Sequence, residues 1–268
     1  MPPPSESYRA LWSNLLSACG AGLLERVVTL HQQVENHANN QALLDRMLEE
    51  ATDKGKAGIV SYFLSNGAHI TPMAIASAID NGSPEVYSLF LSAGLDVNRD
   101  LEKLGDALIC SACMGNFDLV SFLLAKGANP NSGHLRSGKY NALAAAAAAM
   151  GKSVEITEVL LEKGARLAGS GALIVAAEHG SLDLVRYLLD QGADVNEVGI
   201  EAQGDPRTKQ FVGTALHKAA SGGRADVVRL FLDSGADAKL LDGRGKTALQ
   251  MAGNKEVEQV LQHVKSLL

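Results

Sequence analysis

Two cysteines stand three residues apart near the middle of the chain, at Cys110 and Cys113. This C-x-x-C spacing occurs in redox-active dithiols and in one half of many zinc sites. A zinc site needs two more ligands, and a redox motif needs a strand leading into the helix that carries it; the surrounding sequence offers neither. Small residues surround the pair, as in a buried helix, so we predict that both thiols serve packing.

A second candidate is the adjacent pair Glu178 and His179, an acid and an imidazole of the types used in general acid–base catalysis. Neighbouring residues of a helix point about 100° apart, so the two are poorly placed to act as a dyad. The sequence contains no glycine-rich phosphate loop between a strand and a helix, and no His and Cys cluster at metal-ligand spacing. We therefore expect no enzyme, no catalytic residue, no cofactor and no metal.

Regularly spaced glycines indicate the elements that position these residues. Pairs of glycines with one helix length between them recur along the chain, and five pairs have the same twelve-residue gap. A self-similar period near 30 residues is typical of stacked units rather than of a globule with one centre. The pairs are Gly55 and Gly67, Gly82 and Gly94, Gly115 and Gly127, Gly180 and Gly192, Gly223 and Gly235, and the one-residue-wider Gly151 and Gly164.

One unit, residues 171–196, shows the pattern in detail. Ala172 to His179 predicts a short helix, which Gly180 ends, and Ser181 is placed to cap the next helix. The second helix has one apolar face at i, i+3, i+4 spacing and ends before Gly192. Isolated short helices are marginal in water, so each unit must pack on its neighbours.

The residues of these units resemble the ankyrin repeat. The strongest match is Thr-Ala-Leu-His-Lys-Ala-Ala at 214–220, followed by Gly223 and by Gly-Ala-Asp at 235–237; the loops at 192–196 and 127–131 match as well. The resemblance implies an all-α solenoid of stacked helix-turn-helix units with projecting hairpins. It also implies a structural role for His217, with Thr214 as its neighbour.

The resemblance sets the expected domain organisation. Residues 1–10 are predicted to form a flexible leader without features of a secretory signal, and residues 11–268 one ankyrin repeat domain. We place eight repeats, of which the first and last are degenerate caps. They cover approximately 11–34, 44–67, 73–94, 106–127, 141–164, 171–192, 214–235 and 247–264.

Composition excludes several classes of function. The net charge is −6 with no basic stripe, which argues against nucleic-acid binding. No apolar run approaches the roughly 18 residues that a membrane-spanning helix needs. The sequence has only three cysteines, an odd number that does not indicate a disulfide framework, so we expect a reducing compartment, cytoplasmic or nuclear.

Unequal spacing between units predicts where a partner binds. The connecting hairpin at 131–140 is long, the one at 166–170 is short, and the one at 197–213 is the longest, which leaves a notch over the fifth and sixth repeats. By the family template, Glu178 and His179 lie on a wall of this notch, and Ala144 to Ala149 form an open floor of small residues. The predicted partner-binding residues are Arg136, Lys139, Tyr140, Glu178, His179, Arg207, Lys209 and Phe211.

Three hypotheses of function follow. The first, which we favour, is a non-enzymatic adaptor that binds another protein through the groove and hairpins of repeats four to seven. The second is an accessory protein that holds a small molecule, with a possible catalytic role, between hairpins 131–140 and 197–213. The third is a homo-oligomer in which one array docks on another.

Overall fold

The computed structural model describes residues 6–35, 41–101, 105–133, 141–149, 153–199 and 213–267. It divides into two compact units, Met1–Arg99 and Asp100–Leu268. Within the described ranges the regular elements are helices, and extended pairing is limited to one isolated antiparallel bridge between Val198 and Thr214. The prediction of an all-α fold is therefore confirmed.

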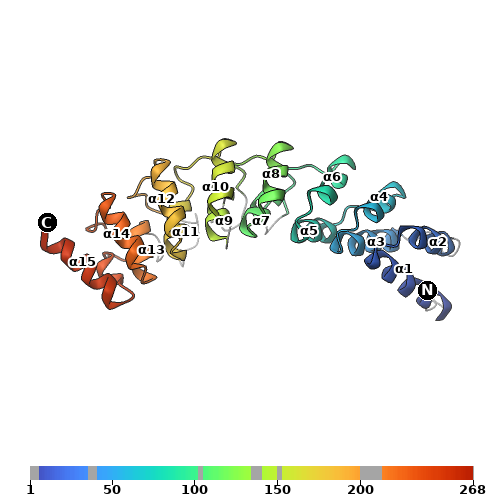
Figure 1. Ribbon diagram of the computed structural model, residues 1–268, viewed down its shortest axis with the longest axis horizontal. Helices are drawn as coiled ribbons and strands as arrows, with labels where there is room; N and C mark the ends of the chain where they lie inside the picture. Colours follow the sequence, from blue (N-terminus) through green and yellow to red (C-terminus); the bar gives the residue numbers. More distant parts are fainter. Residues whose placement is uncertain are drawn as a thin grey trace. The chain divides into compact units, whose positions relative to one another are not determined.

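Unit 1 contains three pairs of helices that stack in two rows (Figure 1). Within each pair the helices pack on one another, α1 with α2, α3 with α4 and α5 with α6; α1, α3 and α5 make one row, and α2, α4 and α6 the other. Helix α1 begins inside the predicted leader, so residues 6–10 are helical, contrary to expectation. The bounds are α1 Glu6–Ala21, α2 Leu24–Glu35, α3 Gln41–Asp53, α4 Ala57–Ser65, α5 Pro72–Asn81 and α6 Pro84–Ser92.

Unit 2 repeats this arrangement. Helices α7, α9, α11 and α13 contact one another in that order and form an inner row, while α8, α10, α12 and α14 form an outer row (Figure 1). The last predicted unit differs, because its first helix is a short 3₁₀ turn, η3. The bounds are α7 Ala107–Cys113, α8 Phe117–Ala125, α9 Ala142–Ala148, α10 Ser153–Glu162, α11 Ala172–His179, α12 Leu182–Asp190, α13 Ala215–Ser221, α14 Ala225–Asp233, η3 Leu249–Met251 and α15 Lys255–Leu267.

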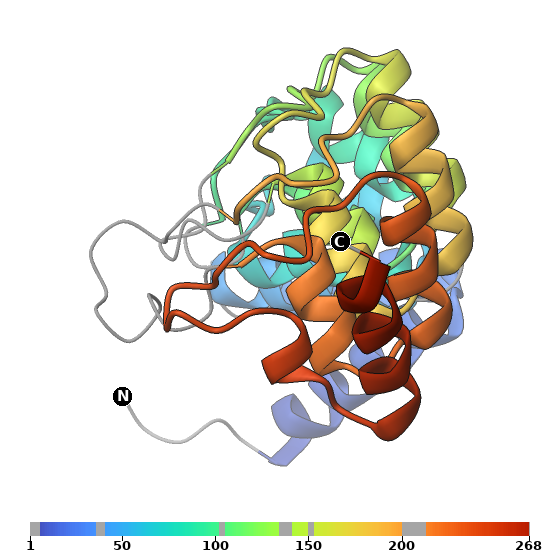
Figure 2. The same cartoon turned by 90° about the vertical axis from the view of Figure 1, so that its left-hand side faces the viewer.

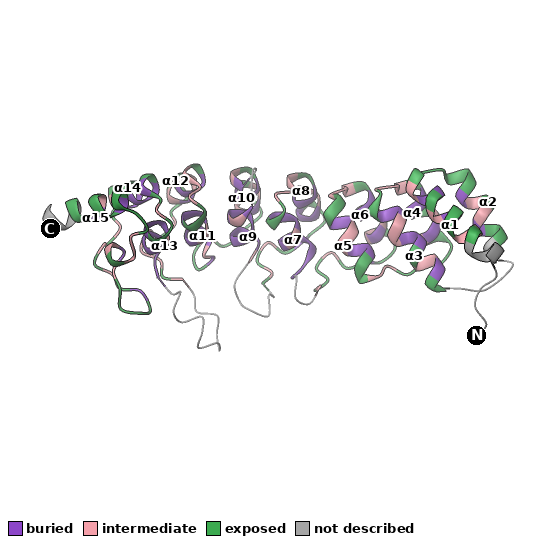
Figure 3. Ribbon diagram, turned by 90° about the horizontal axis from the view of Figure 1, so that it is seen from below, coloured by how far each residue is buried: buried purple, intermediate pink, exposed green. Residues whose placement is uncertain are grey.

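The core of unit 2 lies between its two rows, where each outer helix turns one apolar face toward the inner row (Figure 3). Val185 and Leu188 of α12 and Phe231 of α14 are completely buried, at the positions expected from the i, i+3 spacing. The inner helices meet this face with pairs of small side chains, which let helices approach closely. These buried pairs are Ser111 and Ala112, Ala146 and Ala147, Ala176 and Ala177, and Ala219 and Ala220.

Short polar side chains cap α5, α7 and α9, and the residue type changes from unit to unit, whereas α11 begins at Gly171 without a side-chain cap. The side chains of Thr71, Asp106 and Asn141 each accept a hydrogen bond from the backbone N–H three residues later. Such an N-cap satisfies one of the donors left free at a helix start. Gly180 ends α11 with a left-handed backbone (φ 74°), as predicted, but Ser181 makes no side-chain cap to α12, which corrects the expectation for that residue.

His217 has the structural role that the resemblance implied. Its Nδ1 accepts a hydrogen bond from the backbone N–H of Thr214 (3.2 Å), which leaves the proton on Nε2, facing the carbonyl oxygen of Lys246 at 3.1 Å. The ring is 2 % exposed. One side chain therefore caps α13 and ties it to the connection before η3, which extends away from the helices (Figure 2).

Asparagine side chains join the connecting loops of successive units. Asn131 donates from Nδ2 to the carbonyl oxygen of Gly164 (2.9 Å) and accepts from the backbone N–H of Arg166 at 2.8 Å. Asn196 accepts in the same way from the N–H of Asp237 at 2.8 Å. The shared residue is the last asparagine of the loops at 127–131 and 192–196, so these bonds align neighbouring loops of unit 2.

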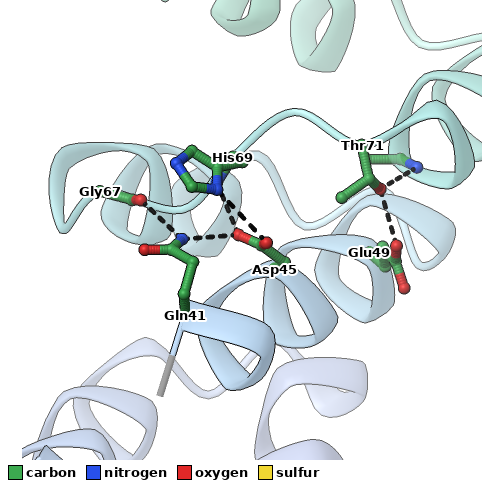
Figure 4. A network of polar contacts seen from close by, with 7 residues as sticks. Gln41, Asp45, Glu49, Gly67, His69 and Thr71 are labelled. Carbon is green, nitrogen blue, oxygen red and sulfur yellow. Dashed lines mark hydrogen bonds and ion pairs between the residues drawn. The ribbon is translucent and has the colours of Figure 1, made fainter. Parts of the chain in front are cut away.

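Unit 1 achieves the same bonding from a helix instead of a loop (Figure 4). Gln41 donates to the carbonyl oxygen of Gly67 (2.9 Å), and Asp45 accepts from the backbone N–H of His69 at 2.7 Å. Two side chains of α3 thus provide the donor to a carbonyl oxygen and the acceptor for a backbone N–H, both of which Asn131 provides by itself in unit 2. One turn further along α3, Glu49 accepts from the hydroxyl of Thr71 at 2.7 Å, which holds the cap residue of α5 in place.

Replacing Asn131 by alanine is expected to reduce the free energy of unfolding by about 1–2 kcal/mol, because Gly164 and Arg166 lose their partners. Urea unfolding measures the change. Asn131→Asp is the matched control: it retains the acceptor for Arg166 but loses the donor to Gly164, so it should remain destabilised. A stability of Asn131→Ala equal to that of the wild type would contradict the role given to this side chain.

Candidate functional site

The C-terminal ends of the inner helices of unit 2 present side chains to solvent. The seventh and eighth residues after each helix cap occupy equivalent places in successive units, and we call this set the inner-end row. It consists of Cys113 and Met114, Ala148 and Ala149, Glu178 and His179, and Ser221 and Gly222. Because α7, α9, α11 and α13 are in contact in that order, these residues form one series along the unit.

Glu178 and His179 are both exposed in this row. Glu178 does not stand alone, since its Oε1 lies 3.3 Å from Nζ of Lys218 on α13. An exposed pair of this kind adds at most about 1 kcal/mol to stability, so it matters more as surface charge than as structure. Lys218 is not among the residues predicted from the sequence. It lies four residues after the cap of α13, at the place that Val175 holds in α11.

The alanines of α9 do not form an open floor. Ala144 to Ala147 are at most 2 % exposed, because α9 packs against α7, α10 and α11, and Ala148 alone is partly exposed (Figure 3). The prediction mistook small side chains for empty space. In a stack, small side chains allow neighbouring backbones to approach, and the neighbours then fill the volume.

The packing prediction is wrong for Cys113. Its side chain is exposed and that of Cys110 is partly exposed, whereas the fully buried small residues of α7 are Ser111 and Ala112. The third cysteine, Cys19, is buried in unit 1, and this burial, together with the charge of Glu50, raises the pKa of its thiol to about 12. All three cysteines are free thiols.

All six partner-binding residues predicted on the hairpins lie outside the described residues. Arg136, Lys139 and Tyr140 fall in 134–140, and Arg207, Lys209 and Phe211 fall in 200–212. The structure does describe where both hairpins leave the stack. Their contribution to a binding site remains the prediction made from the sequence.

Hydrogen bonds hold the base of each hairpin in place. At the first, the hydroxyl of Ser132 donates to the carboxylate of Asp106, the residue that also caps α7. At the second, the bridge between Val198 and Thr214 is accompanied by a bond from the N–H of Gly199 to the carbonyl oxygen of Gly213 (3.2 Å). The segments that connect α8 to α9 and α12 to α13 therefore begin at fixed points beside the caps of the inner helices.

Glu197 connects the base of the second hairpin to the short connection at 166–170. Its carboxylate accepts hydrogen bonds from the backbone N–H groups of Gly171 and Gly169, while Oε1 is buried without a hydrogen-bond partner. Burial raises the pKa of Glu197, and the two backbone donors offset part of that rise. The side chain is committed to this contact, so we do not count it among the exposed binding groups.

Two features are absent from the described residues, a metal-holding cluster of His, Cys, Asp and Glu and a membrane-spanning helix. Within those ranges no three His, Cys, Asp or Glu side chains gather where they could hold a metal ion. Among the same residues, no helix combines the length and the apolar character required to cross a bilayer.

Family models cover most of the chain. Residues 48–134 and 132–198 match the model described as ankyrin repeats (3 copies), and residues 200–252 match the model described as ankyrin repeats (many copies). The ankyrin repeat and KH domain-containing protein mask-1 of Caenorhabditis elegans is 30 % identical over 150 residues, which are 53 % of this chain and 6 % of that protein. The chain spans less than a third of the length of such relatives.

Two solved structures are similar over most of this chain. The ankyrin repeat domain of Bcl-3, described as a unique member of the IkappaB protein family, aligns with a TM-score of 0.59 and 25 % identity, covering 80 % of this chain and 97 % of that one. The human ASB11 ankyrin repeat domain aligns with a TM-score of 0.53 and 25 % identity, covering 93 % and 96 %. Both align with the paired-helix pattern of stacked units.

Proposed function

This chain belongs to the ankyrin repeat family, and from that premise we propose that unit 2 is a non-enzymatic adaptor module that binds another protein. Ankyrin repeat domains generally mediate protein–protein interaction. The proposed binding surface is the inner-end row of repeats four to seven together with the hairpins at 131–140 and 197–213. Cytoplasmic or nuclear residence is part of the proposal, because three free thiols suit a reducing compartment.

The observation that carries this proposal is the exposure of most of the inner-end row, in which Ala148 is partly exposed and Ala149 is buried. Met114 is 53 % exposed, and the flexible thioether side chain of methionine adapts to different apolar partners. Further along the row, Glu178, His179 and the nearby Lys218 supply charge and hydrogen-bonding groups. An apolar contact followed by paired charges is the mixture found at protein interfaces.

The hairpins extend the proposed surface. Their predicted contact residues include arginine, tyrosine and phenylalanine, and Tyr and Arg are common energetic anchors at interfaces. The hydrogen bonds at the base of each hairpin support the inclusion of the hairpins in the binding surface. A loop that starts from a fixed point loses less conformational freedom when a partner binds.

The packing of α9 favours a protein partner over a small molecule. A small-molecule site needs an enclosed apolar volume, and the alanines expected to form an open floor of the notch are buried against neighbouring helices. Catalysis finds no support in the pair that suggested it, because Glu178 is exposed and faces Lys218 instead of the adjacent histidine. A self-complementary homo-oligomer is one outcome of the test below.

The double substitution Glu178→Ala with His179→Ala is expected to reduce partner capture at least about tenfold, through loss of charged contacts at the centre of the surface. The full chain is immobilised, and proteins from the native organism are captured and identified by mass spectrometry. Glu155→Ala with Arg186→Ala is the matched control: it removes an exposed acid and base from the outer helices and should leave capture unchanged.

A second variant tests the hairpins. Arg207→Ala with Phe211→Ala should reduce capture of the same protein while far-UV circular dichroism stays that of the wild type. Loss of capture in the outer-helix control, or full capture by both test variants, would place the binding surface elsewhere. Capture of the chain itself, with a dimer seen by light scattering, would favour the homo-oligomer.

A further inference from the structure

The end of α7 places two sulfur-containing side chains, Cys113 and Met114, on either side of a third, Cys110. The backbone N–H of Met114 donates to the carbonyl oxygen of Cys110 at 3.0 Å, so these two residues are separated by one helical turn. Met114 keeps a helical backbone (φ −78°, ψ −7°), and Cys113 lies three residues after Cys110 within α7. Side chains three and four positions apart on a helix are neighbours, with Cβ atoms about 5–6 Å apart.

Burial in the core does not account for Cys113 and Met114. The core contacts of α7 are made by Ala107, Leu108, Ser111 and Ala112, which are all at most 1 % exposed. Cys113 is exposed, Met114 is 53 % exposed and Cys110 is partly exposed, so the sulfur atoms flank the buried pair instead of belonging to it. At the equivalent places of α9, the neighbouring helix in the row, stand Ala148 and Ala149, which have small side chains without sulfur.

We propose that Cys110, Cys113 and Met114 form a binding site for a soft monovalent metal ion, Cu(I) in the cell. Two thiolates and one thioether are soft ligands, which favour Cu(I) over the hard cations. A structural zinc site requires four ligands, and among the described residues no group of three His, Cys, Asp or Glu side chains is placed to hold a metal ion. Binding releases the thiol protons, because thiolates are the ligands.

The site is separate in chemistry from partner binding, although Cys113 and Met114 belong to the inner-end row. Metal binding is measured on the chain by itself and needs no partner. Failure of the capture experiment therefore leaves this proposal standing, and failure of the metal experiment leaves the adaptor proposal standing.

The test is an anaerobic titration of the reduced full chain with Cu(I) against a chromophoric Cu(I) chelator. The wild type should withdraw one equivalent of copper from the chelator and develop a thiolate-to-copper charge-transfer band. Cys110→Ser and Cys113→Ser should each weaken binding more than about tenfold and abolish the band, and Met114→Leu should weaken it about tenfold while keeping the band. Unchanged circular dichroism verifies that each variant folds.

Cys19→Ser is the matched control. Its thiol is buried in unit 1 and has a pKa of about 12, so it remains protonated and its removal should leave the stoichiometry and the band unchanged. Wild-type binding by Cys113→Ser, or loss of binding in Cys19→Ser, would overturn the site. Copper shared between two chains, seen as a copper-dependent dimer with one ion for two molecules, would overturn it as well.

Discussion

Replacing Ala146 by leucine should destabilise unit 2 by about 3 kcal/mol, at the upper end of the usual range for overpacking a core. Ala146 is completely buried in α9, which packs against α7, α10 and α11. Three additional carbon atoms at this position require the inner helices to separate. In a stack each unit contacts only its neighbours, so the loss should spread from α9 to the adjoining units.

Ala148→Leu is the matched control for this substitution. It makes the same chemical change two residues later in the same helix, where the side chain is partly exposed, and should cost less than about 1 kcal/mol. Urea unfolding gives the two free energies, and hydrogen exchange shows whether protection falls first in α7, α9 and α11. Equal stability of both variants would mean that the volume around α9 is open. That result would favour the hypothesis that the chain holds a small molecule between the hairpins.

The second large effect is expected from His217→Ala, about 2–3 kcal/mol. The buried backbone N–H of Thr214 loses its acceptor, which costs about 1–3 kcal/mol, and removing the buried ring also leaves a cavity. The carbonyl oxygen of Lys246 loses the bond from the histidine but keeps the one from the N–H of Asp242 at 2.8 Å. Hydrogen exchange should locate the damage in α13 and in the connection that leads to η3.

His217→Gln separates the two bonds made by the histidine. A glutamine side chain is long enough to cap α13 through its oxygen, as Gln250 does for the N–H of Thr247 at 2.9 Å. It should thus recover part of the stability of α13 without restoring the bond to Lys246. A stability of His217→Ala within about 0.5 kcal/mol of the wild type would show that the ring serves neither function.

Much of the architecture could be predicted from the sequence because it depends on local chemistry. Glycine at 180 adopts the left-handed backbone that ends α11, and the apolar spacing of α12 identifies the buried Val185 and Leu188. Each signal acts within one or two helical turns, so a single unit contains all of it. Repetition then fixed the stacking, since every unit needs a neighbour to cover its apolar face.

The N-cap residues show that a helix can begin in the same way without the family's sequence signature. Asp106, Asn141 and Thr71 begin their helices in the way that Thr214 does, although the units that contain Asp106 and Asn141 lack the Thr-x-Leu-His signature. Any short side chain with an oxygen acceptor meets this physical requirement, so the fold tolerates divergence that a motif search penalises.

The sequence by itself determined the helices, their ends and their order, because turn chemistry and apolar spacing are properties of adjacent residues. The tertiary structure decided which side chains are available. It buried the alanines of α9, exposed Cys113 and brought Lys218 to Glu178 across forty residues. The exposure of a side chain depends on which residues of the neighbouring unit pack against it. The distance between units is set by packing in three dimensions, and the spacing of residues along the chain does not encode it.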